Sequence, residues 1–148
     1  MKTTYKNKTF NSLFLINSLI FHISIGALFI AIKFEKQFAI EILDIFSTFT
    51  IIPFSLLFII NLISKVKKKI IIAYIFILLY LAFKILFDFI LENPFRETLY
   101  LLIINIALLF IASLSIISIG FSLNNKIGYI ISALFTWLLA CLIYLFIN

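Results

Sequence analysis

Residues 64–91 read SKVKKKIIIAYIFILLYLAFKILFDFIL, a lysine-rich turn followed by a long and almost wholly apolar stretch. An α-helix rises 1.5 Å per residue, so a hydrocarbon layer about 30 Å thick needs about 20 apolar residues to cross it. Backbone amides in lipid must pair within their own segment, and barrel strands would be about half as long and alternating. The stretch 70–91 therefore predicts a membrane-spanning helix.

Four more stretches of the same kind occupy most of the chain. The connections between them are short, so consecutive helices must be antiparallel neighbours. We expect an all-α integral membrane bundle of five transmembrane helices with up-and-down topology, forming a single domain over residues 1–148. The expected spans are 10–32, 42–63, 70–91, 98–121 and 129–147.

Composition supports the membrane class. The chain is 65% hydrophobic and 12% charged, whereas a soluble domain has about 25% charged residues. Its net charge of +6 would elsewhere suggest a nucleic-acid partner. Here the cations flank apolar spans, so helix orientation and anionic lipid headgroups explain them better, and we expect no nucleic acid.

The first span has the flanks of a signal peptide, because Lys2, Lys6 and Lys8 precede it. Its apolar run is about 23 residues, against 7–15 for a signal-peptide core, and no A-x-A cleavage site follows. We expect this span to be retained. The alternative, four mature spans after cleavage, stays open.

The distribution of charge predicts the orientation through the positive-inside rule. With the N-terminus inside and the C-terminus outside, eight cations fall on the inner side and three on the outer, while Lys84 lies within a span. The acidic residues, which did not enter this choice, gather at the outer side. The inner cations are Lys2, Lys6, Lys8, Lys65, Lys67, Lys68, Lys69 and Lys126, and the outer ones Lys33, Lys36 and Arg96.

Lys84 and Asp88 form the most informative polar pair, because they are four residues apart on one helix face and lie within a span. Lys84 sits about 10 Å below the outer boundary. A lysine at the membrane centre costs about 2.5–3.5 kcal/mol on insertion scales. Helical Cα–Cβ bonds tilt toward the N-terminus, here away from the outer surface, so snorkelling is hindered. We expect both side chains to face protein or a water-filled pocket.

Other polar residues can join this pair in a candidate intramembrane cluster: Asn105, His22, Asp44 and Thr48. Glu92 and Arg96, in the following loop, extend it into an ionic outer rim. The cluster is either a structural latch or the entrance to a site for a small polar or ionic ligand.

Small and polar residues also form a stripe on several spans. Such stripes usually pack helix against helix, so we expect them to face inward. Pro53 interrupts the second span, where it leaves the Phe49 carbonyl unpaired and should kink the helix. The stripes are Asn11, Ser18, His22 and Gly26 in the first span, Asp44, Ser47, Thr48 and Ser55 in the second, and Tyr129, Ser132, Thr136 and Ala140 in the fifth.

No catalytic, metal-binding or nucleotide-binding motif is recognisable, so we expect no enzyme, no cofactor and no metal. His22 has no second ligand at a suitable spacing, and three glycines hardly allow a phosphate loop. The abundance of Lys, Phe, Ile and Asn suggests an AT-rich, prokaryotic genome.

The expected function is therefore non-catalytic binding or accessory work in a prokaryotic cytoplasmic membrane. Its partners would be the lipid bilayer and another membrane protein or a second copy of the chain. The alternative is a small transporter or ion-conducting subunit that uses the polar cluster around Lys84 and Asp88.

Overall fold

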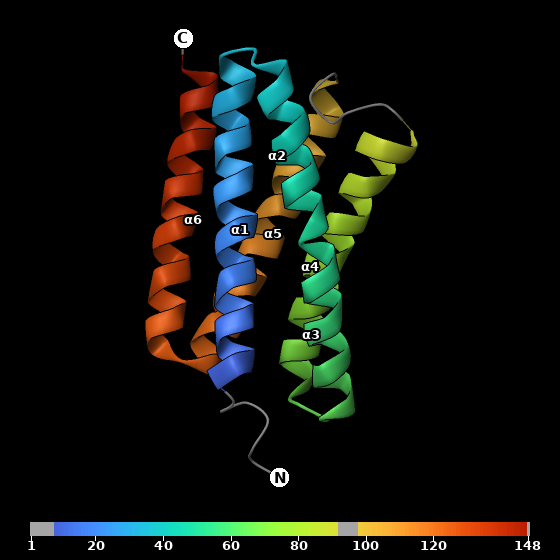
Figure 1. Ribbon diagram of the computed structural model, residues 1–148, viewed down its shortest axis with the longest axis vertical. Helices are drawn as coiled ribbons and strands as arrows, with labels where there is room; N and C mark the ends of the chain where they lie inside the picture. The colour runs from blue at the N-terminus through green and yellow to red at the C-terminus, as the bar shows by residue number, and fades with distance from the viewer. Residues whose placement is uncertain (1–7, 92–97, 148) are drawn as a thin grey trace.

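The computed structural model describes residues 8–91 and 98–147, which form helices with no strand among them (Figure 1). Successive spans run antiparallel to one another (Figure 1). Their bounds are α1 Lys8–Lys33, α2 Gln37–Phe49, α3 Ile51–Ile63, α4 Lys68–Ile85, the π-helical turn η2 Leu86–Ile90, α5 Leu99–Leu123 and α6 Asn125–Phe146.

Within the described residues, five helical segments are long and apolar enough to cross a membrane, and α2 with α3 makes up one of them. This confirms the prediction of five apolar helices long enough to span a membrane. Two of these helices begin before the predicted spans, at Gln37 rather than residue 42 and at Asn125 rather than residue 129. Polar residues are part of these helix starts. Asn124, for example, caps the beginning of α6 by accepting a hydrogen bond of 2.9 Å from the Lys126 N–H.

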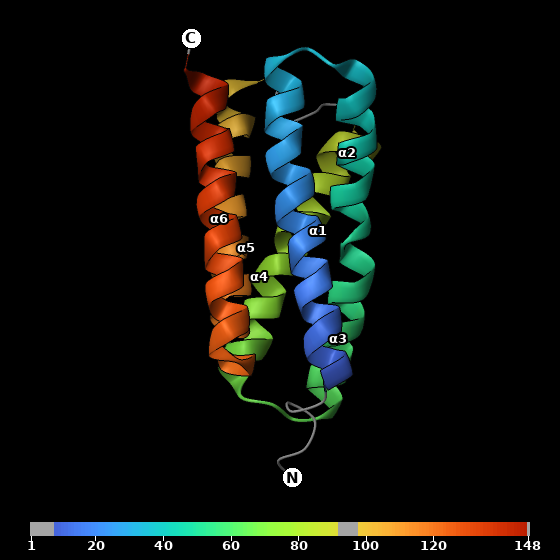
Figure 2. The same cartoon turned by 60° about the vertical axis from the view of Figure 1, so that its left-hand side comes forward.

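The helices close into a ring, in which each packs against its neighbours in sequence and α1 also packs against α6. Figures 1 and 2 show that α1 begins at the end of the bundle opposite to the one where α6 ends. In α1, 56% of the most apolar 18-residue window is buried, compared with 22–39% in the other spans. The first span is therefore the main contributor to the core and packs as an integral part of the bundle.

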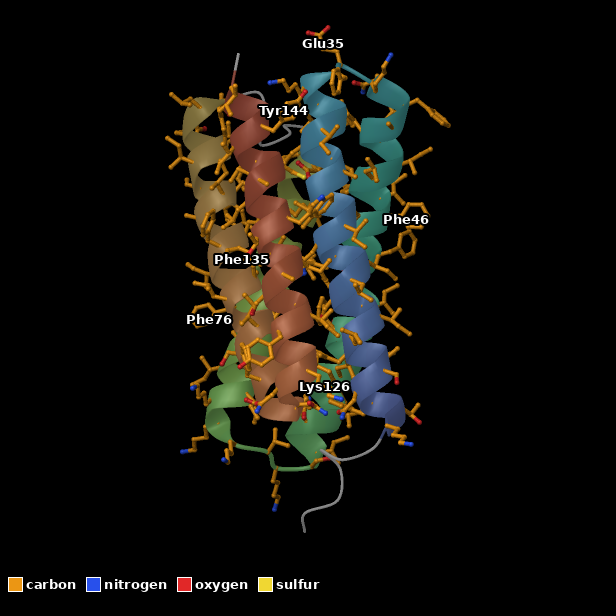
Figure 3. The ribbon with its side chains drawn as sticks, turned by 90° about the vertical axis from the view of Figure 1, so that its left-hand side faces the viewer. Glu35, Phe46, Phe76, Lys126, Phe135 and Tyr144 are labelled. Carbon is orange, nitrogen blue, oxygen red and sulfur yellow. The ribbon has the colours of Figure 1, made fainter. Side chains whose placement is uncertain are left out.

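The outer surface of the bundle is covered with large apolar side chains, including Phe46 and Phe76, which project outward in Figure 3. Exposed apolar surface on this scale suits lipid rather than water. Polar side chains gather at the ends: Lys126 lies at one end in Figure 3, and Glu35 lies at the other.

The contact between α1 and α6 depends on Gly26. A Cβ atom at this position would lie 2.5 Å from Cη2 and 2.9 Å from Cε3 of Trp137, so only glycine leaves room for the indole. The Trp137 indole of α6 therefore packs directly over α1 at this glycine.

The same two helices are joined at their ends by Lys33. Its ammonium group donates hydrogen bonds to the carbonyls of Tyr144, at 2.6 Å, and Ile147, and lies 4.2 Å from the centre of the Tyr144 ring. A cation at these carbonyls interacts favourably with the C-terminal end of the helix dipole. Lys33 thereby holds the last turn of α6 against the end of α1.

The second span is interrupted at Thr50, between α2 and α3 and three residues before Pro53. Proline has no N–H to donate to the Phe49 carbonyl, which accounts for a break at this position. Polar side chains bridge the break. The buried Asn17 side chain of α1 donates to the Thr50 carbonyl at 3.3 Å, and the Thr50 hydroxyl donates to the Ser47 carbonyl at 2.6 Å.

The polar stripes do not all face inward. Ser18, His22 and Gly26 of α1 are buried as predicted, but in α6 Tyr129, Thr136 and Ala140 are exposed. That prediction was wrong for α6, where Thr136 donates to the Ser132 carbonyl and Ser132 to the Gly128 carbonyl. A hydroxyl bonded to its own helix can face lipid at little cost.

Candidate functional site

Lys84 stands at the centre of an ionic triad drawn from two spans. Its Nζ lies 2.7 Å from Asp44 Oδ1 on α2 and 3.0 Å from Asp88 Oδ2 on η2. The lysine is only 3% exposed, and both carboxylates are mostly covered. Its side chain faces the bundle interior, where the two carboxylates offset the desolvation of its charge.

Asp88 lies in a segment where the helix type changes. After Ile85 the α-helix continues as the π-helical turn Leu86–Ile90, in which the Leu91 N–H donates to the Leu86 carbonyl at 2.9 Å. Single π-helical turns are rare and often occur at functional sites. Asp88 lies within this turn, and its Oδ2 atom is 3.0 Å from Lys84 Nζ.

The Asp44–Lys84 pair connects α2 to α4 where the two helices have few other contacts. Toward this end of the bundle, α4 leans away from α2 (Figure 1). A cavity of about 260 Å³ lies beside the triad. Every span contributes to its wall, which is formed by Ile25, Leu28, Phe29, Ile32, Asp44, Tyr80, Lys84, Asp88, Leu102, Asn105, Leu145 and Phe146.

Between the cavity and the end of the bundle where α1 begins, the interior is packed with aromatic rings. Tyr80, one turn before Lys84 and fully buried, packs edge-to-face on Phe21 with ring centres 5.8 Å apart. The series continues to Phe54 at 6.1 Å and from Phe54 to Phe14 at 6.3 Å. Phe14 in turn packs on Tyr74 at 6.4 Å. This aromatic floor, formed by Tyr80, Phe21, Phe54, Phe14 and Tyr74, runs from the cavity toward the end of the bundle where α1 begins.

Asn105 lies in the wall of the same cavity, on α5. Its Oδ1 atom is covered by protein yet has no hydrogen-bond partner among the described residues. A buried amide oxygen normally accepts a hydrogen bond, and leaving it without one costs free energy. Asn105 thus adds an amide group to the polar residues of the cavity wall.

Two other residues of the predicted cluster lie elsewhere. His22 is fully buried on α1, where its Nδ1 is 2.8 Å from the Ser18 carbonyl, and it does not line the cavity. Thr48 lines a separate shallow groove between α2 and the end of α4, together with Phe49 and Ile85. Equivalent depth in the membrane does not ensure that two residues share a face of the bundle.

The predicted outer rim, Glu92 and Arg96, lies outside the described residues. The structure therefore brings together Lys84, Asp88, Asp44 and Asn105 from the predicted cluster. Within the described ranges, no group of three or more His, Cys, Asp or Glu side chains is placed to hold a metal ion.

Much of the cavity wall could not be singled out from the sequence. Tyr80 carried one signal, because it precedes Lys84 by four residues and so shares its face. Ile25, Leu28 and Phe29 carried none, since an apolar residue of a membrane helix looks the same whether it lines a cavity, the core or lipid.

No protein-family model, curated protein or solved structure matches this chain.

Proposed function

We propose that this chain is a multi-pass protein of a prokaryotic cytoplasmic membrane whose work is non-catalytic binding. It holds a small polar ligand in the cavity beside Asp44, Lys84 and Asp88. The observation that carries the proposal is the placement of a 3%-exposed lysine and two carboxylates on the wall of a cavity bounded by all five spans.

The energetics of membrane proteins support this use of the triad. Ionisable groups within a span are costly and are usually kept for ligand or ion sites. A purely structural latch would need one lysine and one carboxylate, yet a second carboxylate is present and the cavity remains beside it. Ligand sites characteristically combine mostly apolar walls with a few convergent polar groups, as found here.

Binding fits better than conduction because of the aromatic floor. Phe14, Phe21, Phe54, Tyr74 and Tyr80 are all at most 1% exposed. A conducting path through the bundle would have to pass these packed rings, which offer little to a hydrated ion. The packed rings thus separate the cavity from the end of the bundle where α1 begins.

A cavity-blocking variant tests the proposal. Leu102→Trp places an indole in the cavity wall, whereas Ile103→Trp adds the same group on the neighbouring, outward-facing residue. Thermal unfolding in non-ionic detergent should be measured with butylammonium, 1-butanol and butyrate. At least one probe should raise the melting temperature of the native chain and of Ile103→Trp, but not of Leu102→Trp.

Two results would contradict binding in this cavity. One is the absence of any melting shift with all three probes. The other is a shift that Leu102→Trp retains in full. Flux of a probe through the reconstituted protein, abolished by Leu102→Trp, would instead favour the alternative of a small transporter.

The proposal includes an orientation with the N-terminus inside and the C-terminus outside, because eight cations lie on the N-terminal side against three on the other. A reporter fused after Asn148 should be active only outside the cytoplasm, and one fused at Lys67 only inside. The reverse pattern would place the cavity on the cytoplasmic side and overturn this part of the proposal.

A further inference from the structure

We propose that the turn between α3 and α4 binds the phosphate headgroup of an anionic glycerophospholipid. This lysine turn, residues 64–69, carries Lys65, Lys67, Lys68 and Lys69, and all four side chains are exposed. Figure 1 shows the turn at the end of the bundle where α1 begins, whereas the cavity lies toward the end where α1 joins α2. The inference therefore concerns a second surface and does not depend on the cavity.

The charge of the lysine turn is not neutralised by the fold. The described acidic residues are Glu35, Glu41, Asp44 and Asp88, which belong to the opposite end of the bundle, where Figure 3 labels Glu35. None of the four lysines forms an ion pair within the described ranges. An anion that neutralises the turn would therefore have to come from outside these residues.

The position of the lysines on α4 does not stabilise that helix. Lys67 is the N-cap of α4 and makes no side-chain cap hydrogen bond, and the first turn of the helix contains no acidic residue. Cations at this end of a helix interact unfavourably with its dipole, and neighbouring like charges repel one another. A phosphate bound by the lysines would relieve both effects.

The backbone of the lysine turn is fixed on both sides. The Lys65 N–H donates to the Leu62 carbonyl at 3.2 Å. The Val66 N–H donates to the Asn61 carbonyl at 3.3 Å, which completes the Schellman pattern of a helix C-terminus. Val66 packs against the hydrophobic core, and Ile70 is buried in it. The lysines are thus displayed between two anchored residues, which lowers the entropic cost of binding a headgroup.

Exposed apolar side chains beside the turn favour a lipid over a soluble anion. Ile63, the last residue of α3, is 77% exposed, and Ile72 of α4 is 51% exposed. Lys68 precedes Ile72 by four residues and so shares its helix face. Helical Cα–Cβ bonds tilt toward the N-terminus, which in α4 is toward the membrane surface at this end. The lysines can therefore reach phosphates while acyl chains cover the isoleucines, a combination that a soluble acidic protein or a nucleic acid does not offer.

The test titrates dioleoylphosphatidylglycerol and dioleoylphosphatidylcholine, which differ in headgroup charge but not in acyl chains, into the purified full chain in non-ionic detergent. Phosphatidylglycerol should bind at least about fivefold more tightly, since one lysine near an anionic headgroup contributes about this factor. The preference should weaken in high salt, which screens exposed charges. Affinities follow from the concentration dependence of the melting temperature.

A double charge variant tests the location. Lys67→Gln with Lys69→Gln should lose at least about fivefold in phosphatidylglycerol affinity. Without lipid the same variant should be as stable as the native chain or slightly more stable, because cations leave the N-terminal end of α4. Lys36→Gln with Lys126→Gln makes the same change in charge at exposed positions of two other turns and should bind the lipid as the native chain does.

Three results would overturn the inference. The first is equal stabilisation of the native chain by the two lipids, which would leave the lysines only a role in helix orientation. The second is an equal loss of affinity in the variant and its control, which would assign the effect to overall charge rather than to the turn. The third is stabilisation by glycerol phosphate or polyglutamate at concentrations as low as those of phosphatidylglycerol, which would identify a soluble anion or an acidic protein as the partner.

The lipid inference and the cavity proposal can fail separately. Leu102→Trp changes the wall of the cavity and leaves the lysine turn intact, so this variant should bind phosphatidylglycerol as the native chain does. A loss of lipid binding in Leu102→Trp would place the lipid in the cavity and would also overturn the assignment to the turn.

Discussion

Replacement of Lys84 by methionine is expected to cause the largest loss of stability of any single substitution in the triad. The change leaves Asp44 and Asp88 without their shared cation in a mostly buried site. Removing one partner of a buried ion pair costs about 3–5 kcal/mol, because the charge left behind is uncompensated. The melting temperature in detergent, or the abundance in the membrane, should fall sharply.

Restoration of charge balance should recover this loss in steps. Lys84→Met with Asp88→Asn still leaves Asp44 charged, so recovery should be partial. The triple change that adds Asp44→Asn removes every charge of the triad and should recover most of the stability. Lys36→Met, which removes an exposed lysine near the same end of the bundle, is the matched control. Equal stability of Lys84→Met and this control would mean that the triad does not stabilise the fold.

Enlargement of Gly26 should have the next largest effect. Gly26→Val places a branched side chain where even a single Cβ would meet the Trp137 indole. Overpacking of a tight contact typically costs about 1–3 kcal/mol, and here it would separate α1 from α6. The expected result is a lower melting temperature and faster hydrogen exchange in both helices.

A compensating change separates the clash from other effects of valine in a helix. The double variant Gly26→Val with Trp137→Ala should lose less free energy of unfolding than the sum of the losses of the two single variants. The reason is that the indole no longer occupies the space that valine needs. Ala140→Val enlarges an exposed residue of α6 and should be close to neutral. Strict additivity of Gly26→Val and Trp137→Ala would show that the two residues do not compete for the same space.

The polar cluster around Lys84 shows which contacts helical spacing can predict and which it cannot. The i,i+4 relation of Lys84 to Asp88 follows from the sequence alone, and so does the expectation that neither faces lipid. The 2.7 Å contact of Lys84 with Asp44 does not, because it depends on how α2 packs near α4. The structure thus turns an expected pair into a triad, so we expect the double change at Lys84 and Asp88 to restore stability only in part.

The polar stripes show what helical spacing cannot predict, namely which face of a helix is buried. In α1 the stripe of Ser18, His22 and Gly26 is buried, whereas in α6 Thr136 and Ala140 are exposed. Small and hydroxyl residues can serve an interface, or they can satisfy themselves on their own helix. Nothing in the sequence separates these two uses, because the local hydrogen bonds are equally available in both.

By itself the sequence determined the helical class, the five spans and the break near Pro53. These follow from backbone hydrogen bonding and apolar length, which act within each segment. The tertiary structure alone decided which helix faces meet, where α4 leaves a cavity, and that His22 and Thr48 lie away from it. In lipid, apolar side chains gain no hydrophobic free energy by turning inward, so helix rotation depends on close packing and on a few polar contacts between spans.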